Sequence, residues 1–155
     1  MRVVKTTSDD PEFIALVKQL DADLAVTDGD EHAFYDQYNK LDHINYVLVG
    51  YINDKAIACG AIKKYNDVTV EIKRMYTLPL ERGKGHAVKI LLELEAWASQ
   101  LKFKKCILET GTRQPYAIAL YKKCGYKIIE NYGQYKGVKN SVCFEKNLFP
   151  KDQSK

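Results

Sequence analysis

The sequence lacks the features that would place it in a membrane or outside the cell. None of its apolar runs approaches the roughly 18 residues that a membrane-spanning helix requires. Its first five residues lead into polar residues rather than into the apolar core of a signal peptide. Its 155 residues, 46% of them hydrophobic, suffice for one full core and are too few for two. We therefore expect one cytoplasmic domain over residues 1–149 and a flexible tail over residues 150–155.

Metal-binding and redox patterns are also missing. The two histidines of the first third of the chain, His32 and His43, show no ligand spacing with cysteine or carboxylate residues. No pair of cysteines has the spacing of a metal site or a dithiol motif. The cysteines lie far apart in the sequence, at Cys59, Cys106, Cys124 and Cys143. We expect buried, reduced thiols and no metal.

The charge of the chain is weakly positive and scattered. The net charge is +4, and no basic block lies beside aromatic residues as in a known nucleic-acid motif. We therefore expect no nucleic-acid partner, although a basic interaction domain with salt-sensitive binding remains an alternative. A small anionic ligand suits this charge at least as well. The acidic residues crowd one early stretch that could attract a cation: Asp21, Asp23, Asp28, Asp30 and Glu31.

The hydrophobic pattern predicts alternating strands and helices, with no repeats and no low-complexity segments. The expected strands span residues 2–5, 46–52, 56–64, 68–77, 106–108, 126–130 and 141–148. The expected helices span residues 11–27, 31–38, 85–101 and 115–123. One strand-helix-strand unit lies among otherwise antiparallel strands, which predicts a mixed sheet covered by helices.

Two of these elements have clear buried faces. Alternation in the strand over residues 68–77 predicts that Glu71 lies on a polar face. The side chains expected on its opposite, buried face are Val68, Val70 and Ile72. The apolar stripe expected to face inward from the helix over residues 85–101 consists of Ala87, Ile90, Leu91, Leu94 and Trp97.

The segment from Arg82 to Ala87 reads Arg-Gly-Lys-Gly-His-Ala and lies between a strand and the start of a helix. Its glycines let the backbone approach a ligand closely, and the first amides of a helix have no intrahelical partner. The helix dipole adds roughly half a positive charge there. Arg82, Lys84 and His86 add side-chain donors suited to phosphate oxygens. We therefore expect this turn to bind an anion such as a diphosphate.

Other interpretations of the turn differ in spacing. A Walker loop is excluded, because one residue rather than four separates Gly83 from Gly85 and His86 follows. The dinucleotide-binding fingerprint is a closer alternative, since Glu109 ends the next strand near the place of a ribose-binding acid. Against it, Val88 replaces the third glycine or alanine, and the preceding strand alternates in polarity. A plain helix start whose basic residues serve solubility also remains open.

Two spaced motifs resemble the GNAT superfamily of acetyl-CoA-dependent N-acetyltransferases. The coenzyme signature of that family, Gln or Arg, two residues, Gly, one residue, then Gly or Ala, is matched by Arg82, Gly85 and Ala87. A second family pattern is the helix Asn-x-x-Ala-x-x-Leu-Tyr that leads into Gly-Phe or Gly-Tyr. It is matched at Ala117, Leu120, Tyr121, Gly125 and Tyr126. Gln114 stands where the family has asparagine, so an amide is retained.

The resemblance covers essentially the whole chain and implies both a fold and an activity. The implied fold is α/β (α+β), with a mixed, mostly antiparallel sheet of about seven strands, helices on both faces and one central βαβ unit. The implied activity is acetyl transfer from the co-substrate acetyl-CoA to a primary amine of a small molecule or peptide, by direct attack in a ternary complex. A non-catalytic acyl-CoA sensor is the alternative.

The resemblance also implies roles for individual residues. Glu71 would be the general base, acting directly or through water, and Tyr121 the general acid that protonates the leaving thiolate. Without the resemblance, the sequence also allows structural roles: Glu71 could be a solvated strand residue, and Tyr121 could be a core residue. Backbone groups of Met75 and Tyr76 would hold the pantetheine arm, with one N–H facing the thioester carbonyl. The coenzyme would contact Met75, Tyr76, Arg82, Gly83, Lys84, Gly85, His86, Ala87, Gln114 and Tyr121.

The acceptor is less defined. The family commonly lines its acceptor site where this chain has acidic and tyrosine residues, which would suit a cationic amine, although a solvated acidic loop accounts for them equally. These residues are Asp28, Asp30, Glu31, Tyr35 and Tyr38. A polyamine, an amino acid, an aminoglycoside, a peptide terminus and a protein lysine would all fit. A homodimer is one option for the assembly, because family members often form dimers.

Overall fold

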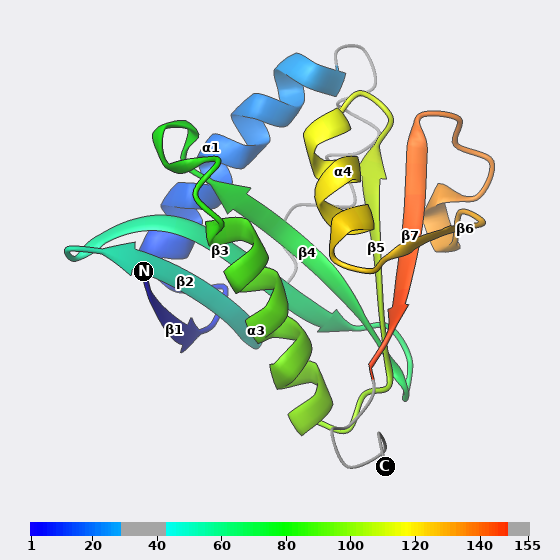
Figure 1. The fold of residues 1–155 in the computed structure, drawn as a ribbon, viewed down its shortest axis with the longest axis horizontal. Coiled ribbons are helices and arrows are strands. Elements are labelled where there is room, and N and C mark those ends of the chain that lie inside the picture. Colours follow the sequence, from blue (N-terminus) through cyan, green and yellow to red (C-terminus); the bar gives the residue numbers. More distant parts are fainter. Residues whose placement is uncertain (29–42, 149–155) are drawn as a thin grey trace. The chain divides into compact units, whose positions relative to one another are not determined.

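The computed structural model describes residues 1–28 and 43–148, and these fall into two units. The first unit consists of Met1–Lys63 with Lys73–Leu94, and the second of Lys64–Ile72 with Glu95–Lys155. Strand β4 (Thr69–Thr77) and helix α3 (His86–Gln100) each contribute residues to both units. Both elements are labelled in Figure 1. The single domain expected over residues 1–149 stays a prediction.

The strands form one mixed sheet of seven strands in the order β1-β2-β3-β4-β5-β7-β6. Strands β4 and β5 run parallel and are connected through α3, which confirms the predicted βαβ unit. The pairs β1/β2, β2/β3, β5/β7 and β6/β7 are antiparallel. The predicted α/β class with a mostly antiparallel sheet is therefore confirmed.

The bounds of the elements agree closely with the sequence prediction. The other strands are β1 (Arg2–Thr6), β2 (Tyr46–Ile52), β3 (Lys55–Lys64), β5 (Lys105–Gly111), β6 (Lys127–Ile129) and β7 (Ser141–Asn147). The remaining helices are α1 (Pro11–Asp28), α4 (Pro115–Lys123) and two short 3-10 turns, η2 (Pro79–Glu81) and η3 (Gly133–Tyr135). Only β5 is clearly longer than expected. The short helix expected over residues 31–38 and the tail lie outside the described residues.

Local signals explain where the first elements begin and turn. Asp10 precedes Pro11, and its Oδ1 accepts a hydrogen bond from the backbone N–H of Glu12 at 2.9 Å, which caps the start of α1. The β2–β3 connection has Asn53 and Asp54 at φ 49° and 67°. Asn and Asp tolerate this left-handed conformation, which two-residue hairpin turns require.

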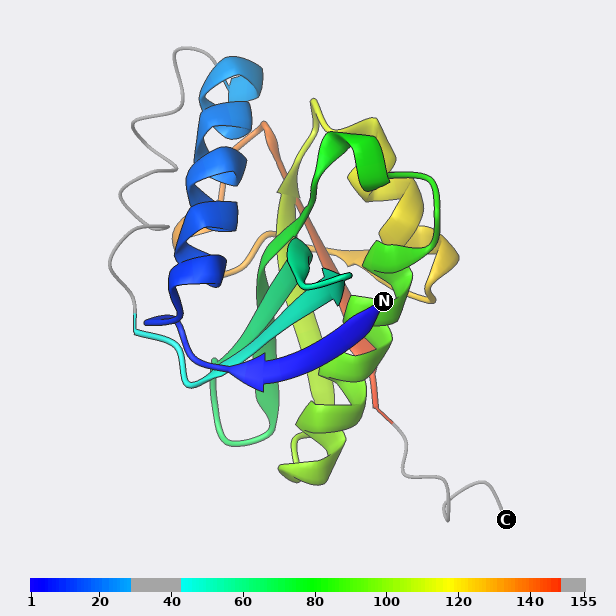
Figure 2. The ribbon, with the colours of Figure 1, turned by 90° about the vertical axis from the view of Figure 1, so that its left-hand side faces the viewer.

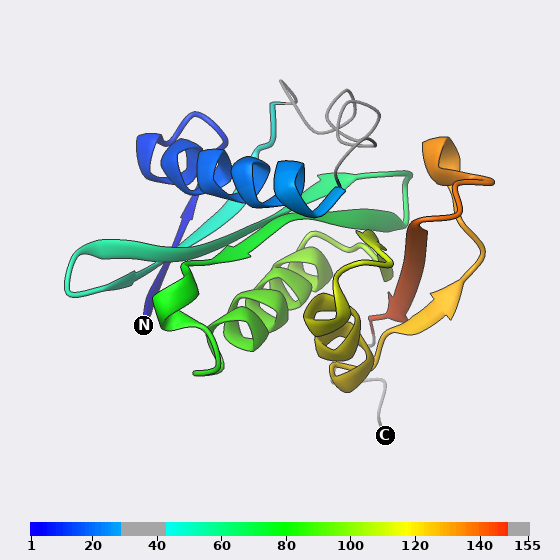
Figure 3. The same ribbon diagram turned by 90° about the horizontal axis from the view of Figure 1, so that it is seen from above.

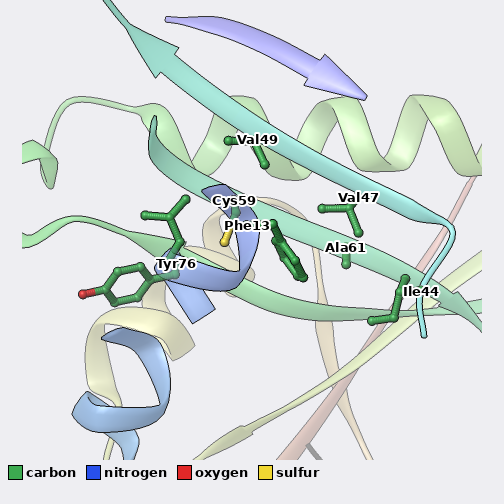
Figure 4. Packing of buried hydrophobic residues seen from close by; sticks show 8 residues of the cluster. Phe13, Ile44, Val47, Val49, Cys59, Ala61 and Tyr76 are labelled. Carbon is green, nitrogen blue, oxygen red and sulfur yellow. The ribbon is translucent and has the colours of Figure 1, made fainter. Parts of the chain in front are cut away.

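In the first unit, helices cover both faces of β3. Phe13 and Leu16 of α1 pack with buried residues of β2 and β3. Figure 2 shows α1 beside these strands, and Figure 4 shows Phe13 among the buried side chains. This cluster is completed by Ile44, Val47, Val49, Cys59, Ala61 and Tyr76. Gly60 lies between Cys59 and Ala61 and therefore faces the other side of the strand. There it meets the first part of α3, so that α1 and α3 lie on opposite sides of β3 (Figure 3).

The approach of α3 to β3 depends on Gly60. A Cβ atom at this position would lie 2.6 Å from Met75 Sδ, 2.8 Å from Ile90 Cγ2 and 2.9 Å from Leu94 Cδ1. These contacts are too short, and both helix side chains are fully buried. We expect Gly60→Ala to lower the free energy of unfolding by about 2 kcal/mol, because the packed helix must shift. Urea unfolding measures this. Gly111→Ala, whose Cβ atom would lie no closer than 3.7 Å to any neighbouring atom, controls for the loss of a glycine without a close contact.

In the second unit, Phe144 of β7 and Leu108 of β5 are almost fully buried. Helix α4 reaches this core through Tyr121, whose ring centroid lies 6.0 Å from that of Phe144. The predicted strand alternation was wrong at its first residue: Val68 is 46% exposed and Thr69 is 2% exposed. Val68 precedes β4 and donates its N–H to Asn66 Oδ1 at 3.0 Å, which places it in the turn.

Helix α3 buries most of its predicted stripe. Ile90, Leu91 and Leu94 are fully buried, whereas Ala87 and Trp97 are only half-buried.

The four cysteines are free thiols, and all but the half-buried Cys124 are buried, as expected. Among residues 1–28 and 43–148, no helix is both long and apolar enough to cross a membrane.

Candidate active site

The turn between β4 and α3 presents an open, glycine-lined backbone in the first unit. Gly83 and Gly85 have φ values of +78° and +85°, and a Cβ atom at either position would meet nothing within 4 Å. Glycine adopts this left-handed conformation at no steric cost. The helix begins at His86, so the amides of its first turn have no intrahelical acceptor. An anion has direct access to backbone donors here.

Arg82 is held in place at the start of this turn. Its Nε donates to the carbonyl oxygen of Thr77 at 2.8 Å, and Nη2 lies 3.4 Å from Asp23 Oδ2 of α1. Its guanidinium carbon lies 5.4 Å from the ring centroid of Tyr76. These contacts use only part of the donor set of the guanidinium, which carries five N–H groups. The remaining donors are oriented by the anchored ones.

Lys84 and His86 both lie near Glu81, the last residue of η2. Lys84 Nζ lies 3.1 Å from Glu81 Oε1, and both side chains are accessible to solvent. His86 Nε2 lies 3.9 Å from the same oxygen, beyond hydrogen-bond distance. It is the one buried side-chain nitrogen or oxygen atom of the described residues that has no hydrogen-bond partner. Such an atom beside open helix amides suits a polar ligand.

The end of β4 departs from regular strand geometry just before Met75. Arg74 has φ +61°, which is strained for a residue with a side chain. Its largely buried side chain is paired with Asp21 of α1, with Nη1 and Oδ1 3.3 Å apart. Its carbonyl oxygen accepts a hydrogen bond from Cys59 Sγ at 3.3 Å. The residues that follow this irregularity, Met75 and Tyr76, are the predicted pantetheine contacts.

In the second unit, Glu71 has a partner that the sequence did not indicate. Glu71 lies on β4 opposite Ile107 of β5 and is half-buried. Its Oε2 accepts a hydrogen bond of 2.6 Å from the hydroxyl of Tyr132. Burial raises the pKa of Tyr132, and the Glu71 carboxylate raises it further. Tyr132 therefore stays protonated and donates to Glu71.

Tyr121 lies in α4 and belongs to the core of the second unit. It is 6% exposed, and its ring packs against Tyr126 and Phe144 at centroid distances of 5.8 and 6.0 Å. Burial raises its pKa, and the neighbouring Cys124 and Glu109 raise it further. The phenol is therefore protonated at neutral pH and a weaker acid than an ordinary tyrosine.

The comparisons with known proteins decide the family. The sequence model of the acetyltransferase (GNAT) family matches residues 13–126. The chain is a GNAT-family acetyltransferase. It is 31% identical over 137 residues to the uncharacterized N-acetyltransferase YjgM of Escherichia coli, covering 81% of this chain and 80% of that protein.

Solved structures show the same fold as this acetyltransferase. A Klebsiella pneumoniae protein assigned to the acyl-CoA N-acyltransferases superposes with a TM-score of 0.80 and 32% identity, over 96% of this chain and 97% of that one. A GNAT acetyltransferase from Elizabethkingia anophelis, solved with acetyl-CoA bound, superposes with a TM-score of 0.68. It is 18% identical, over 95% of this chain and 97% of that one. That comparison concerns the fold alone.

The predicted site residues of the acetyltransferase divide between the two units. Met75, Tyr76 and the turn from Arg82 to Ala87 belong to the first, and the second holds Glu71, Gln114 and Tyr121. Gln114 directly precedes α4, and its side chain does not cap that helix. Asp28 ends α1, and nothing of its side chain is described. The other predicted acceptor residues, Asp30, Glu31, Tyr35 and Tyr38, lie outside the described residues.

Two pairings of described residues were missed by the sequence analysis. Asp21 and Asp23 of the acidic stretch pair with Arg74 and Arg82 of the same unit. Tyr132 was also missed, since the connection between β6 and β7 has no periodic pattern. A tyrosine-rich stretch, Tyr-Gly-Gln-Tyr at residues 132–135, was the available signal.

Proposed function

We propose that this GNAT acetyltransferase transfers an acetyl group from acetyl-CoA to a primary amine of a small molecule or peptide, by direct attack in a ternary complex. The observation that most supports this proposal is the turn from Arg82 to Ala87, where open glycines, free helix amides and cations lie together. These groups fit a diphosphate, which supplies no covalent chemistry but anchors the acetyl donor. Backbone groups of Met75 and Tyr76 belong to the same unit as this turn, and the family resemblance adds Gln114 and Tyr121 to the proposed coenzyme contacts.

The chemical step requires two proton movements. Acetyl-CoA supplies an activated acetyl group as a thioester. Glu71 takes a proton from the acceptor ammonium, directly or through water, so that the nitrogen lone pair can form the new C–N bond. Tyr121 donates its phenolic proton to the sulfur when the C–S bond breaks, and the second proton that the nitrogen loses as the amide forms restores the phenol. In this proposal an acidic, tyrosine-bearing acceptor site that includes Asp28, Glu31 and Tyr35 attracts the cationic amine.

Coenzyme binding can be tested with two matched lysine variants. Lys84→Gln removes a cation of the turn, and Lys64→Gln removes one from a similar exposed pair, in which Lys64 Nζ lies 3.2 Å from Asp67 Oδ1. We expect Lys84→Gln to weaken coenzyme A binding by roughly 3- to 5-fold in calorimetry, the effect of an exposed ionic contact. Lys64→Gln should bind like the wild type. Equal weakening by both, or no binding and no thermal stabilisation of the wild type, would contradict the proposal.

The acceptor class can be found with a library of amines and thiol release as the readout. Polyamines, amino acids, aminoglycosides and peptides with free termini or lysines cover the candidate chemistry. Turnover with at least one of them, dependent on both substrates, is the expected result. A chain that binds coenzyme A but releases no thiol with any amine would instead be a sensor.

A further inference from the structure

We propose that Tyr132 is a positioning residue that holds one oxygen of Glu71 and leaves the other directed to the acceptor amine. This inference rests on the proposed function, in which Glu71 removes the proton from the amine. It adds the β6–β7 connection, which carries Tyr132, to the machinery of the site.

The geometry of the pair carries the inference. The distance of 2.6 Å between the Tyr132 hydroxyl oxygen and Glu71 Oε2 is that of a charge-assisted hydrogen bond. Within the described part of the chain, Oε1 of Glu71 accepts no hydrogen bond. A glutamate side chain on a strand has several rotamers, and one strong hydrogen bond selects among them. Tyr132 therefore fixes where the free oxygen lies.

Tyr132 is itself held firmly enough to act in this way. Its ring makes edge contacts with Tyr65 and Tyr135, at centroid distances of 5.4 and 5.8 Å. The preceding residue, Asn131, donates from Nδ2 to the carbonyl oxygens of Val138 and Ser141 at 2.9 and 3.1 Å. These bonds tie the two ends of the connection between β6 and β7 together. The ring contacts and the Asn131 hydrogen bonds therefore hold the Tyr132 hydroxyl in position.

The consequence for the reaction is a defined path for one proton. The amine proton moves to the open Oε1 of Glu71, or to a water bound there, while the N–H bonding pair remains on nitrogen. Tyr132 keeps its own proton, because burial and the neighbouring carboxylate raise its pKa. It donates a hydrogen bond to Oε2 of Glu71 and so holds the carboxylate in the orientation that presents Oε1. Tyr132 therefore acts only through Glu71.

A double-mutant cycle on kcat tests this dependence. The variants are Tyr132→Phe, Glu71→Gln and the combination, assayed with an amine that the wild type acetylates. Tyr132→Phe keeps the ring contacts, and we expect kcat to fall about 10-fold, the effect of one charge-assisted hydrogen bond, with little change in the KM for acetyl-CoA. In the Glu71→Gln background, Tyr132→Phe should have no further effect. Tyr65→Phe removes a hydroxyl from the same ring cluster and should leave kcat unchanged.

The outcomes separate this inference from the proposed function. An unchanged kcat in Tyr132→Phe, or the same reduction in both backgrounds, would show that Tyr132 does not act through Glu71, while acetyl transfer itself would stand. A reduction that Tyr65→Phe reproduces would indicate a packing effect and overturn the inference as well. A wild type that acetylates no amine would refute the proposed function, and the positioning role would fall with it.

Discussion

Replacing Glu71 by glutamine is expected to lower kcat by roughly 10²- to 10⁴-fold, the range of general base catalysis. The amide keeps the shape of the side chain and can still accept the hydrogen bond that Tyr132 donates to Oε2. It cannot take a proton from an ammonium group at neutral pH. The variant should therefore fold and bind coenzyme A normally. Single-turnover thiol release with saturating substrates measures the chemical step.

A neighbouring carboxylate provides the control for Glu71. Glu109 lies on β5 in the same unit, and its Oε2 accepts a hydrogen bond from Ser141 Oγ at 2.8 Å. Glu109→Gln removes the same charge from the same unit without touching the proposed base. A comparable loss of kcat in both variants would indicate a general electrostatic effect. An unaltered rate in Glu71→Gln would exclude Glu71 as the base.

Replacing Lys146 by methionine is expected to lower the free energy of unfolding by about 3 kcal/mol, because a buried carboxylate loses its counter-charge. Glu95 of α3 is 7% exposed, and its Oε1 lies 2.8 Å from Lys146 Nζ of β7. Its Oε2 accepts a hydrogen bond of 2.8 Å from the Tyr126 hydroxyl. Burial raises the pKa of Tyr126, and Cys106 and Glu95 raise it further, so this donor persists. The single hydrogen bond from Tyr126 does not compensate the buried negative charge of Glu95.

Two further variants complete this stability experiment. Lys127→Met removes a lysine that is 71% exposed and pairs with Glu145 at 3.8 Å, and it should cost less than about 1 kcal/mol. Glu95→Gln combined with Lys146→Met should recover much of the loss, since no unpaired charge remains. Guanidinium unfolding with linear extrapolation gives all values. If Lys146→Met cost no more than Lys127→Met, the Glu95 network would not stabilise the fold.

The fold of this acetyltransferase was largely predictable because its signals are local. The asparagine and aspartate turn at residues 53–54, the proline after Asp10 and the glycine after α4 each act over a few residues. The signal of the turn from Arg82 to Ala87 is local too, since its glycine spacing and its place before a helix can both be seen in the sequence. The error at the start of the strand over residues 68–77 has a local cause as well. Val68 continues the alternation of its strand but lies in a turn set by Asn66.

The sequence by itself determined the order of the strands and helices, the place of the glycine-containing turn before α3 and, through two motifs, the family. It could not show which side chains meet over long sequence separations. The tertiary structure decided that Tyr132 donates to Glu71 across 61 positions and that Arg82 pairs with Asp23 across 59. Such pairs have no shared periodicity or spacing, because only the pairing of strands and the packing of helices bring them together. That is why the partner of the proposed base became visible only in the folded chain.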